Sequence, residues 1–124
     1  MKKYVWAILT NAEPGLEDEF NKWYNEVHAG DVLRVPGILT IQRFRLADTQ
    51  TVPEPTGIKV VPTGQSSLSY KYLALYTIET DDLPTVLQTV ADRAGTAEMP
   101  MSDAISPDIG TMCYELMMAG TPSA

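Results

Sequence analysis

Strand-like and helix-like segments follow one another in an order that few folds accommodate. β-branched and aromatic residues gather in four segments that we expect to be strands, namely residues 3–10, 38–46, 70–79 and 111–119. Apolar residues recur at helical spacing in residues 15–30 and 83–94, which predicts two amphipathic helices. The order β-α-β-β-α-β is typical of an α+β, ferredoxin-like fold, in which a four-stranded antiparallel sheet carries both helices on one face.

Two further segments show no period. Residues 47–68 and 95–109 contain several prolines and glycines, and we expect both to be long irregular loops. A loop as long as residues 47–68 often acts as a lid over a site. No repeat or linker divides the 124 residues, so we expect a single domain over residues 1–124.

The predicted strands carry apolar residues on both faces instead of alternating cleanly with polar ones. In residues 3–10, for example, Trp6 and Ile8 share one face while Val5 and Ala7 share the other. A lone sheet of this kind would leave its helix-free face polar. We therefore expect that face to be covered, most simply by the same sheet of a second copy in a two-fold homodimer.

Composition and charge exclude several classes of partner. The formal net charge of −7 disfavours nucleic acids and anionic membranes, because phosphate recognition needs clustered Lys and Arg. No apolar run approaches the ~20 residues of a membrane-spanning helix, and residues 4–9 are too short for the core of a signal peptide. Cys113 is the only cysteine and has no internal disulfide partner. We expect a cytoplasmic protein that binds neither nucleic acid nor membrane.

The only histidine, His28, lies in the segment best suited to proton chemistry. Helical positions three and four apart are neighbours, so His28 adjoins Tyr24 and Asp31. We expect Asp31 to accept a hydrogen bond from one imidazole nitrogen, leaving the other nitrogen free for a substrate. His28 falls on the flank of the predicted core stripe, which consists of Leu16, Phe20, Trp23 and Val27. The competing interpretation is that His28 only caps the helix through its dipole.

Other side chains suit the binding of a small aromatic or hydrophobic ligand; we select Trp23, Arg43, Tyr72 and Tyr76. Arg43 and Arg45 share one face of a predicted strand and suit a substrate carboxylate or phenolate. The favoured alternative is that they pair with Glu79 or Glu115 across the sheet, or cover the dimer interface. Trp23 and the tyrosines also suit simple packing in the core.

A resemblance to a known family rests on residues 1–46. The residues that carry it are Phe20, Trp23, Tyr24, His28, Asp31, Pro36 and Gly37, followed by Arg43 and Phe44 in the next strand. This pattern resembles the EthD-type branch of the dimeric α/β-barrel superfamily. Beyond residue 46 the resemblance extends only to the order of elements, and residues 47–68 are longer than in the most compact members.

The resemblance implies a homodimer whose sheets face each other, with a pocket between each sheet and its own helices. The superfamily includes polyketide cyclases, lactone isomerases, small dehydratases, haem-degrading monooxygenases and members of no known activity. We expect no metal or cofactor, because the chain has no zinc-ligand cluster, no Gly-rich phosphate loop and no G-x-S-x-G motif.

The first functional hypothesis is a cofactor-independent lyase or isomerase of the dehydratase or cyclase type. His28 would be the base, Asp31 would orient it, and Tyr24 would bond the carbonyl oxygen of a small hydrophobic or aromatic metabolite. One alternative is a non-catalytic small-molecule-binding accessory protein of a catabolic pathway. A second alternative is a haem-dependent monooxygenase.

Overall fold

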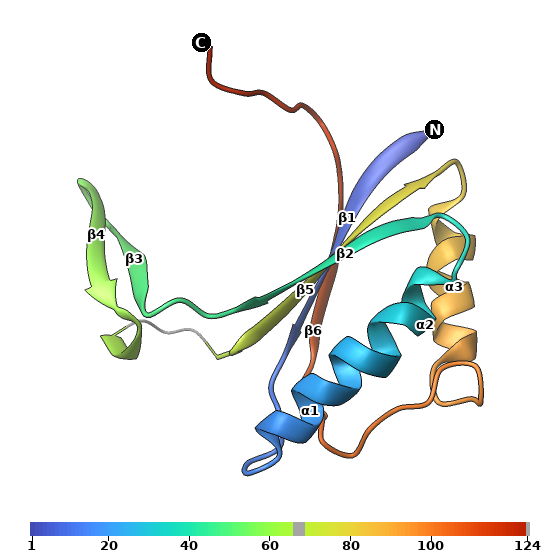
Figure 1. Ribbon diagram of the computed structural model, residues 1–124. Helices are drawn as coiled ribbons and strands as arrows, with labels where there is room; N and C mark the ends of the chain where they lie inside the picture. The colour runs from blue at the N-terminus through green and yellow to red at the C-terminus, as the bar shows by residue number, and fades with distance from the viewer. Residues whose placement is uncertain (66–68, 124) are drawn as a thin grey trace.

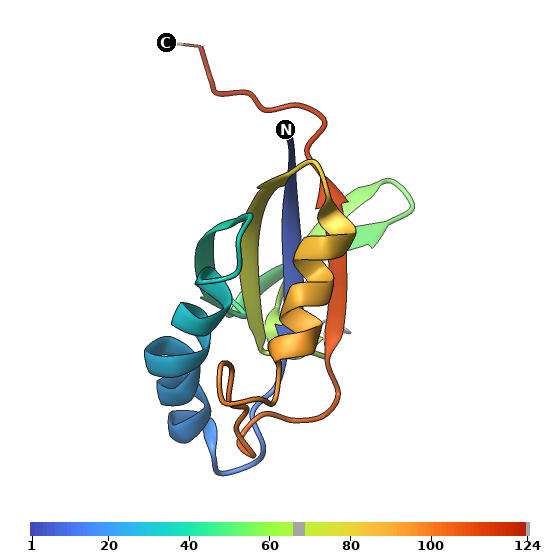
Figure 2. The ribbon, with the colours of Figure 1, turned by 90° about the vertical axis from the view of Figure 1, so that its right-hand side faces the viewer.

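The computed structural model describes residues 1–65 and 69–123 and has the predicted ferredoxin-like architecture (Figure 1). Its main sheet has the strand order β2-β5-β1-β6, with every neighbouring pair antiparallel. The four strands are β1 (Lys2–Thr10), β2 (Ile38–Arg45), β5 (Tyr72–Thr80) and β6 (Gly110–Glu115). Two helical rods lie side by side on one face of this sheet (Figure 2). The predicted fold class is confirmed.

The first helical rod is longer than predicted and is not uniform. It consists of α1 (Glu17–Trp23), the π-helical turn η1 (Tyr24–His28) and α2 (Ala29–Leu33). In the π-helical turn the amide of Ala29 bonds to the carbonyl of Tyr24, five residues back. The wider turn places residues four apart on one face. Phe20, Tyr24 and His28 are therefore buried, while Val27, predicted to lie in the core, is 39% exposed.

The second helix, α3 (Leu83–Arg93), begins close to the predicted position. Asp82 caps it, because its carboxylate accepts a hydrogen bond from the amide of Thr85 at 3.2 Å. Val86 and Val90 are the buried residues of this helix. No helix within residues 1–65 or 69–123 combines the length and apolar character needed to cross a bilayer.

The core lies between the helices and the covered face of the sheet. On β5, Tyr72, Ala74, Tyr76 and Ile78 alternate toward the helices and are buried. Antiparallel register places Trp6 of β1 opposite Tyr76, with ring centroids 5.4 Å apart. Aromatic side chains thus form much of the floor beneath the first helical rod.

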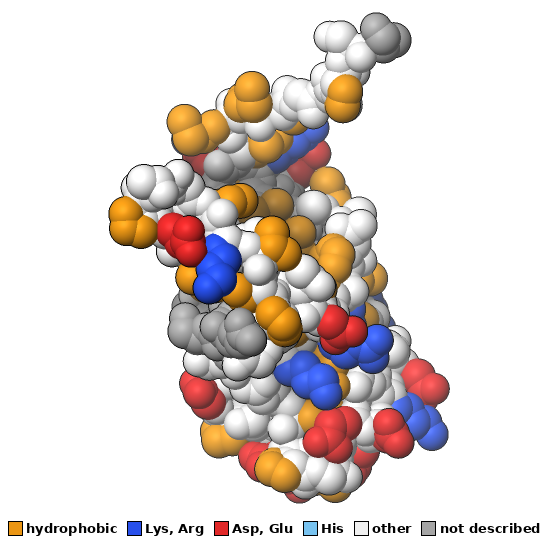
Figure 3. All heavy atoms as spheres, turned by 90° about the vertical axis from the view of Figure 1, so that its left-hand side faces the viewer, with side chains coloured by type: hydrophobic (Ala, Val, Ile, Leu, Met, Phe, Trp, Pro, Cys, Tyr) orange, Lys and Arg blue, Asp and Glu red, His pale blue; other side chains and the backbone are white. Residues whose placement is uncertain are grey.

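Hydrophobic side chains are scattered among polar ones on the helix-free side of the sheet (Figure 3). The register brings Leu75 of β5 beside Ala7 of β1, and Ala7 beside Met112 of β6. Phe44 and Tyr114 are exposed on the outer strands. The predicted two-sided apolar character of the strands is therefore present in the structure.

The prediction that residues 47–68 form an irregular loop is wrong for most of that segment. β3 (Thr49–Glu54) pairs with β4 (Gly57–Pro62) in a separate antiparallel hairpin, followed by the short 3₁₀ turn η2 (Thr63–Gln65). The prolines that argued against strands are tolerated because both strands of a two-stranded sheet are edges. The hairpin projects away from the main sheet (Figure 1). Residues 66–68 of the predicted loop lie outside the described residues.

The segment between α3 and β6 contains no helix or strand. Two isolated bridges hold it in place, one between Ala94 and Met99 and one between Ala12 and Ile105. β6 ends at Glu115, so the predicted strand over residues 111–119 is too long. The chain after Glu115 leaves the sheet as an extended tail (Figure 1).

Candidate active site

A cavity of about 160 Å³ lies between the covered face of the sheet and the helices. Its walls come from β1, both helical rods and the segment between α3 and β6. Apolar side chains such as Ile8, Val32 and Met99 line most of it. Tyr24 and His28 are among the few polar groups in its wall. A cavity of this size is close to one that holds benzene, so the space suits a single six-membered ring.

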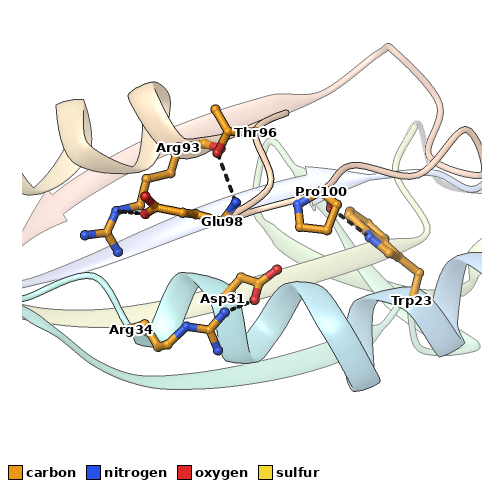
Figure 4. Close-up of polar contacts among 7 residues, drawn as sticks. All are labelled: Trp23, Asp31, Arg34, Arg93, Thr96, Glu98 and Pro100. Atoms are coloured by element: carbon orange, nitrogen blue, oxygen red, sulfur yellow. Dashed lines mark hydrogen bonds and ion pairs between the residues drawn. The ribbon is translucent and has the colours of Figure 1, made fainter.

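Aromatic rings hold His28 in place within this wall. The imidazole is 8% exposed and stacks on the indole of Trp23, with centroids 4.6 Å apart and planes at 21°. Tyr24 meets it edge-on, with centroids 4.9 Å apart. The Trp23 indole N–H in turn donates to the carbonyl of Pro100 at 3.1 Å (Figure 4). Trp23 is therefore a support beneath His28 and a link to the segment between α3 and β6.

Burial dominates the protonation of His28. It lowers the pKa of the imidazole to about 4, with Asp31 acting to raise it and Arg43 to lower it further. The ring is neutral at pH 7 and carries a lone pair that is able to accept a proton. The neutral imidazole is the form that accepts a proton in general base catalysis, although its burial makes it a weaker base than a free imidazole.

Asp31 does not make the predicted hydrogen bond to His28. Its Oδ1 pairs with the guanidinium of Arg34, three residues along the helix (Figure 4). A charged guanidinium is a stronger donor than a neutral imidazole, which explains the preference. Within the described part of the chain, Asp31 Oδ2 and His28 Nδ1 are both buried without a hydrogen-bond partner. No three His, Cys, Asp or Glu side chains among residues 1–65 and 69–123 gather as a metal site.

Two buried tyrosines meet beside the imidazole. The hydroxyl oxygens of Tyr24 and Tyr76 lie 3.0 Å apart, so one hydroxyl donates to the other. Burial raises the pKa of both phenols, and both are neutral donors at physiological pH. Tyr24 belongs to the cavity wall, whereas Tyr76 lies behind it on β5.

Arg43 and Tyr72 line a different cavity, of about 280 Å³, and the Arg43 guanidinium lies over the Tyr24 ring. The predicted pairing of Arg43 with Glu79 or Glu115 is wrong. Arg43 shares the register position of buried Ala74, so it faces the helices, where it bonds to asparagine side chains of the first helical rod. Of the four predicted substrate-binding residues, Arg43 and Tyr72 therefore line this cavity, whereas Trp23 and Tyr76 line neither of the two.

Several residues of the His28 cavity were not predicted. The irregular segment between α3 and β6 contributes Met99, Met101 and Ile105. Its apolar residues do not recur at regular spacing, so the sequence does not indicate which side chains face the core. The available signal was an unusual density of apolar residues around Pro100 in a segment otherwise typical of a surface loop. Thr10, the last residue of β1, also lines the cavity and is buried.

The geometry agrees with the comparisons to known proteins. The sequence matches the model of the EthD domain over residues 13–112, which is most of the chain. The chain belongs to the EthD family. EthD domains are part of the dimeric α/β-barrel superfamily, so the predicted relationship is confirmed. No match to this EthD chain is found among curated proteins.

The EthD chain is also similar to solved structures. One is a protein from Shewanella loihica PV-4, provisionally described as a monooxygenase, with a TM-score of 0.58 and 10% identity. That match covers 96% of this chain and 99% of the other, and at this identity it shows the fold alone. Another is an EthD family protein from Bacillus halodurans C-125, with a TM-score of 0.43 and 16% identity over 94% of this chain and 100% of the other.

Proposed function

We propose that this EthD protein is a cofactor-independent lyase or isomerase, of the dehydratase or cyclase type, acting on a small hydrophobic or aromatic carbonyl compound. The observation that carries the proposal is the buried, neutral imidazole of His28 in the wall of an otherwise apolar, ring-sized cavity. Tyr24 lies in the same wall. An apolar cavity excludes water, which strengthens hydrogen bonds to charge that develops during a reaction.

The reaction begins with proton transfer. His28 removes a proton from the carbon next to the carbonyl, and the electron pair of that C–H bond moves onto the carbonyl oxygen. The Tyr24 and Tyr76 hydroxyls share one hydrogen bond, and in the arrangement where Tyr76 is the donor the Tyr24 proton is free to bond the developing enolate oxygen. The imidazolium then returns the proton, either to a different carbon in an isomerisation or to a departing hydroxyl in a dehydration.

Asp31 supports the imidazolium that forms in this step. Its carboxylate already acts to raise the pKa of His28 across the helix surface. We propose that its Oδ2, which is buried and unpartnered, receives an N–H from the protonated ring when the pair rearranges. Asp31 is therefore proposed as a positioning residue, and Arg34 holds its other oxygen.

Haem does not fit the His28 cavity. A space of about 160 Å³ holds a single six-membered ring and is too small for a porphyrin. The proposed reaction therefore depends on the side chains described above. A non-catalytic binding protein is the competing function, and the orienting bond missing between Asp31 and His28 is the observation that favours it.

Deuterium exchange tests the proposal. Incubation of cyclohexanone or acetophenone with the protein in D₂O is expected to replace hydrogen next to the carbonyl, as followed by proton NMR. Replacing His28 by Gln should slow this exchange by about 10²–10⁴-fold, the usual contribution of a general base. Glu26→Gln, on the exposed side of the same turn, is the matched control and should exchange like the wild type. Saturable binding without any exchange would instead establish the binding-protein alternative.

We also propose that the protein is a homodimer through the helix-free face of the sheet. Leu75, Phe44 and Tyr114 leave an apolar surface there that an isolated chain does not cover. The β3–β4 hairpin and the C-terminal tail both extend on the side away from the helices (Figure 1) and expose Ile58 and Met117. A second copy on this face would bury all of these groups together.

A further inference from the structure

We propose that the cavity beside Arg43 is a binding site for a small oxyanion, a carboxylate or a phosphate, separate from the His28 cavity. This inference goes beyond the proposed function, because the two cavities share no lining residue. The residues that line the Arg43 cavity are Asn21, Asn25, Arg43, Phe44, Arg45 and Tyr72.

The guanidinium of Arg43 is held rigidly at the wall of this cavity. It donates to Asn25 Oδ1 at 2.8 Å and to Asn21 Oδ1 at 3.0 Å. Its plane lies over the Tyr24 ring, with the guanidinium carbon 4.3 Å from the ring centroid. An arginine has five N–H donors, so these two bonds leave others for a ligand. The side chain is therefore preorganised for binding, which reduces the entropy lost when a ligand is bound.

The positive charge of this cavity lacks a counter-charge. Within residues 1–65 and 69–123, no carboxylate forms an ion pair with Arg43 or Arg45. The partners of Arg43 are neutral amide oxygens and aromatic rings. Two of the nine Lys and Arg residues thus line this cavity in a chain of net charge −7.

The donor set identifies the ligand class. A guanidinium fork matches the geometry of carboxylate and phosphate oxygens, and cationic ligands are excluded by its charge. The Tyr72 hydroxyl accepts a hydrogen bond from Asn21 Nδ2 at 3.3 Å, which leaves its own proton for the same ligand. Phe44 contributes an apolar wall for any hydrocarbon part of the ligand.

A bound anion would also be detected at His28. The Tyr24 ring contacts the Arg43 guanidinium and the imidazole of His28. The charge of Arg43 is one of the influences that lower the pKa of His28, opposed by the charge of Asp31. Partial neutralisation of Arg43 by an anion should therefore raise the pKa of His28. This readout does not require turnover, so it separates the anion site from the proposed catalysis.

Calorimetric titration with sodium acetate, sodium benzoate and sodium phosphate tests the site, with chloride used to keep ionic strength constant. We expect one-to-one saturable binding of at least one of these anions, weakened tenfold or more by Arg43→Gln. Arg45→Gln should weaken binding several-fold. Arg93→Gln is the control. It removes an arginine of α3 that is paired with Glu98 and does not line the cavity (Figure 4), so this variant should bind the anions like the wild type. The tightest probe distinguishes a carboxylate site from a phosphate site.

Two results would overturn the inference. One is that none of the three anions binds more tightly than chloride. The other is that Arg43→Gln binds them as the wild type does. If Arg43→Gln does not fold, the exposed Arg45 carries the test through Arg45→Gln. NMR titration of the His28 ring provides a second measurement, because its pKa should rise at a saturating concentration of the tightest anion and stay unchanged in sodium chloride.

Discussion

The two faces of the main sheet carry similar amounts of apolar side chain but differ in what covers them. Ala74, Tyr76 and Ile78 of β5 are buried under the helices, whereas Leu73 and Leu75 of the same strand remain partly exposed on the helix-free face. The covered face also contains tyrosine hydroxyls and faces the imidazole of His28. The helix-free face around Leu75 and Ala7 is mainly apolar. Apolar content alone therefore does not reveal which face builds a site; the buried polar groups do.

The largest difference between the two faces should appear in stability. Phe20 is fully buried and its ring packs against Trp23, Tyr24 and Tyr72. Phe20→Ala should lower the free energy of unfolding by about 3–5 kcal/mol, because it leaves a cavity in a packed core. Phe44 is 46% exposed on the other face, and Phe44→Ala is the matched control with an expected loss of less than about 1.5 kcal/mol. Urea denaturation measures both, and equal losses would contradict this contrast.

A smaller effect should follow from the buried imidazole of the covered face. The unfolded chain takes up a proton at His28 near pH 6.5, whereas the folded chain does so only near pH 4. Protonation therefore favours the unfolded state between these values, and stability should fall as pH drops from about 6.5 to 4, by roughly 2–3 kcal/mol in total. Above about pH 7.5, where the unfolded chain is also neutral at His28, this residue contributes no pH dependence.

The carboxylates also titrate at low pH, so the measurement is a difference between two proteins. Urea denaturation at a series of pH values is compared for the wild type and His28→Gln. The glutamine variant should lose less stability over this range. Identical pH profiles would show that the folded protein does not resist protonation of His28.

A charged residue placed on the helix-free face should weaken the proposed dimer. Leu75→Lys places a cation in the centre of this face and, by symmetry, twice in a dimer. We expect the dimer to dissociate roughly tenfold or more readily, which is about 1.4 kcal/mol. Leu33→Lys, at an exposed leucine on α2, is the control. Analytical ultracentrifugation distinguishes a dimer from the 13.6 kDa chain, and a wild-type monomer at all concentrations would refute the proposed interface.

The helices and the strands of the main sheet could be predicted from the sequence because apolar residues recur in them at regular spacing. Alternation in β5 and the spacing in α3 directly reflect which side chains are buried. The β3–β4 hairpin was missed because Pro53 and Pro62, which lie within its strands, are poor strand residues, and the rule against them applies to central strands. Local patterns also do not indicate that a hairpin will stand apart from the main sheet.

The candidate site could be predicted only in part, for a different reason. The neighbouring positions of Tyr24 and His28 follow from helical spacing, and the structure places both in one wall. The choice of Arg34 as the partner of Asp31 depends on competition between donors, which spacing does not rank. The position of Arg43 against Asn21 and Asn25 depends on how a strand and a helix pack together, which is information at long range.

The π-helical turn over Tyr24–His28 makes the position of the imidazole depend on chain length as well as on residue identity. Each residue in an α-helix turns the chain by about 100°. If the same residues adopted ordinary α-helical winding, a drift of about 40° for every four residues would separate the inward-facing positions before and after the turn. Every side chain of the wall would still be present, yet His28 would point elsewhere. In evolutionary terms, a one-residue insertion in an ordinary helix is a route by which a packing surface acquires an inward-facing base.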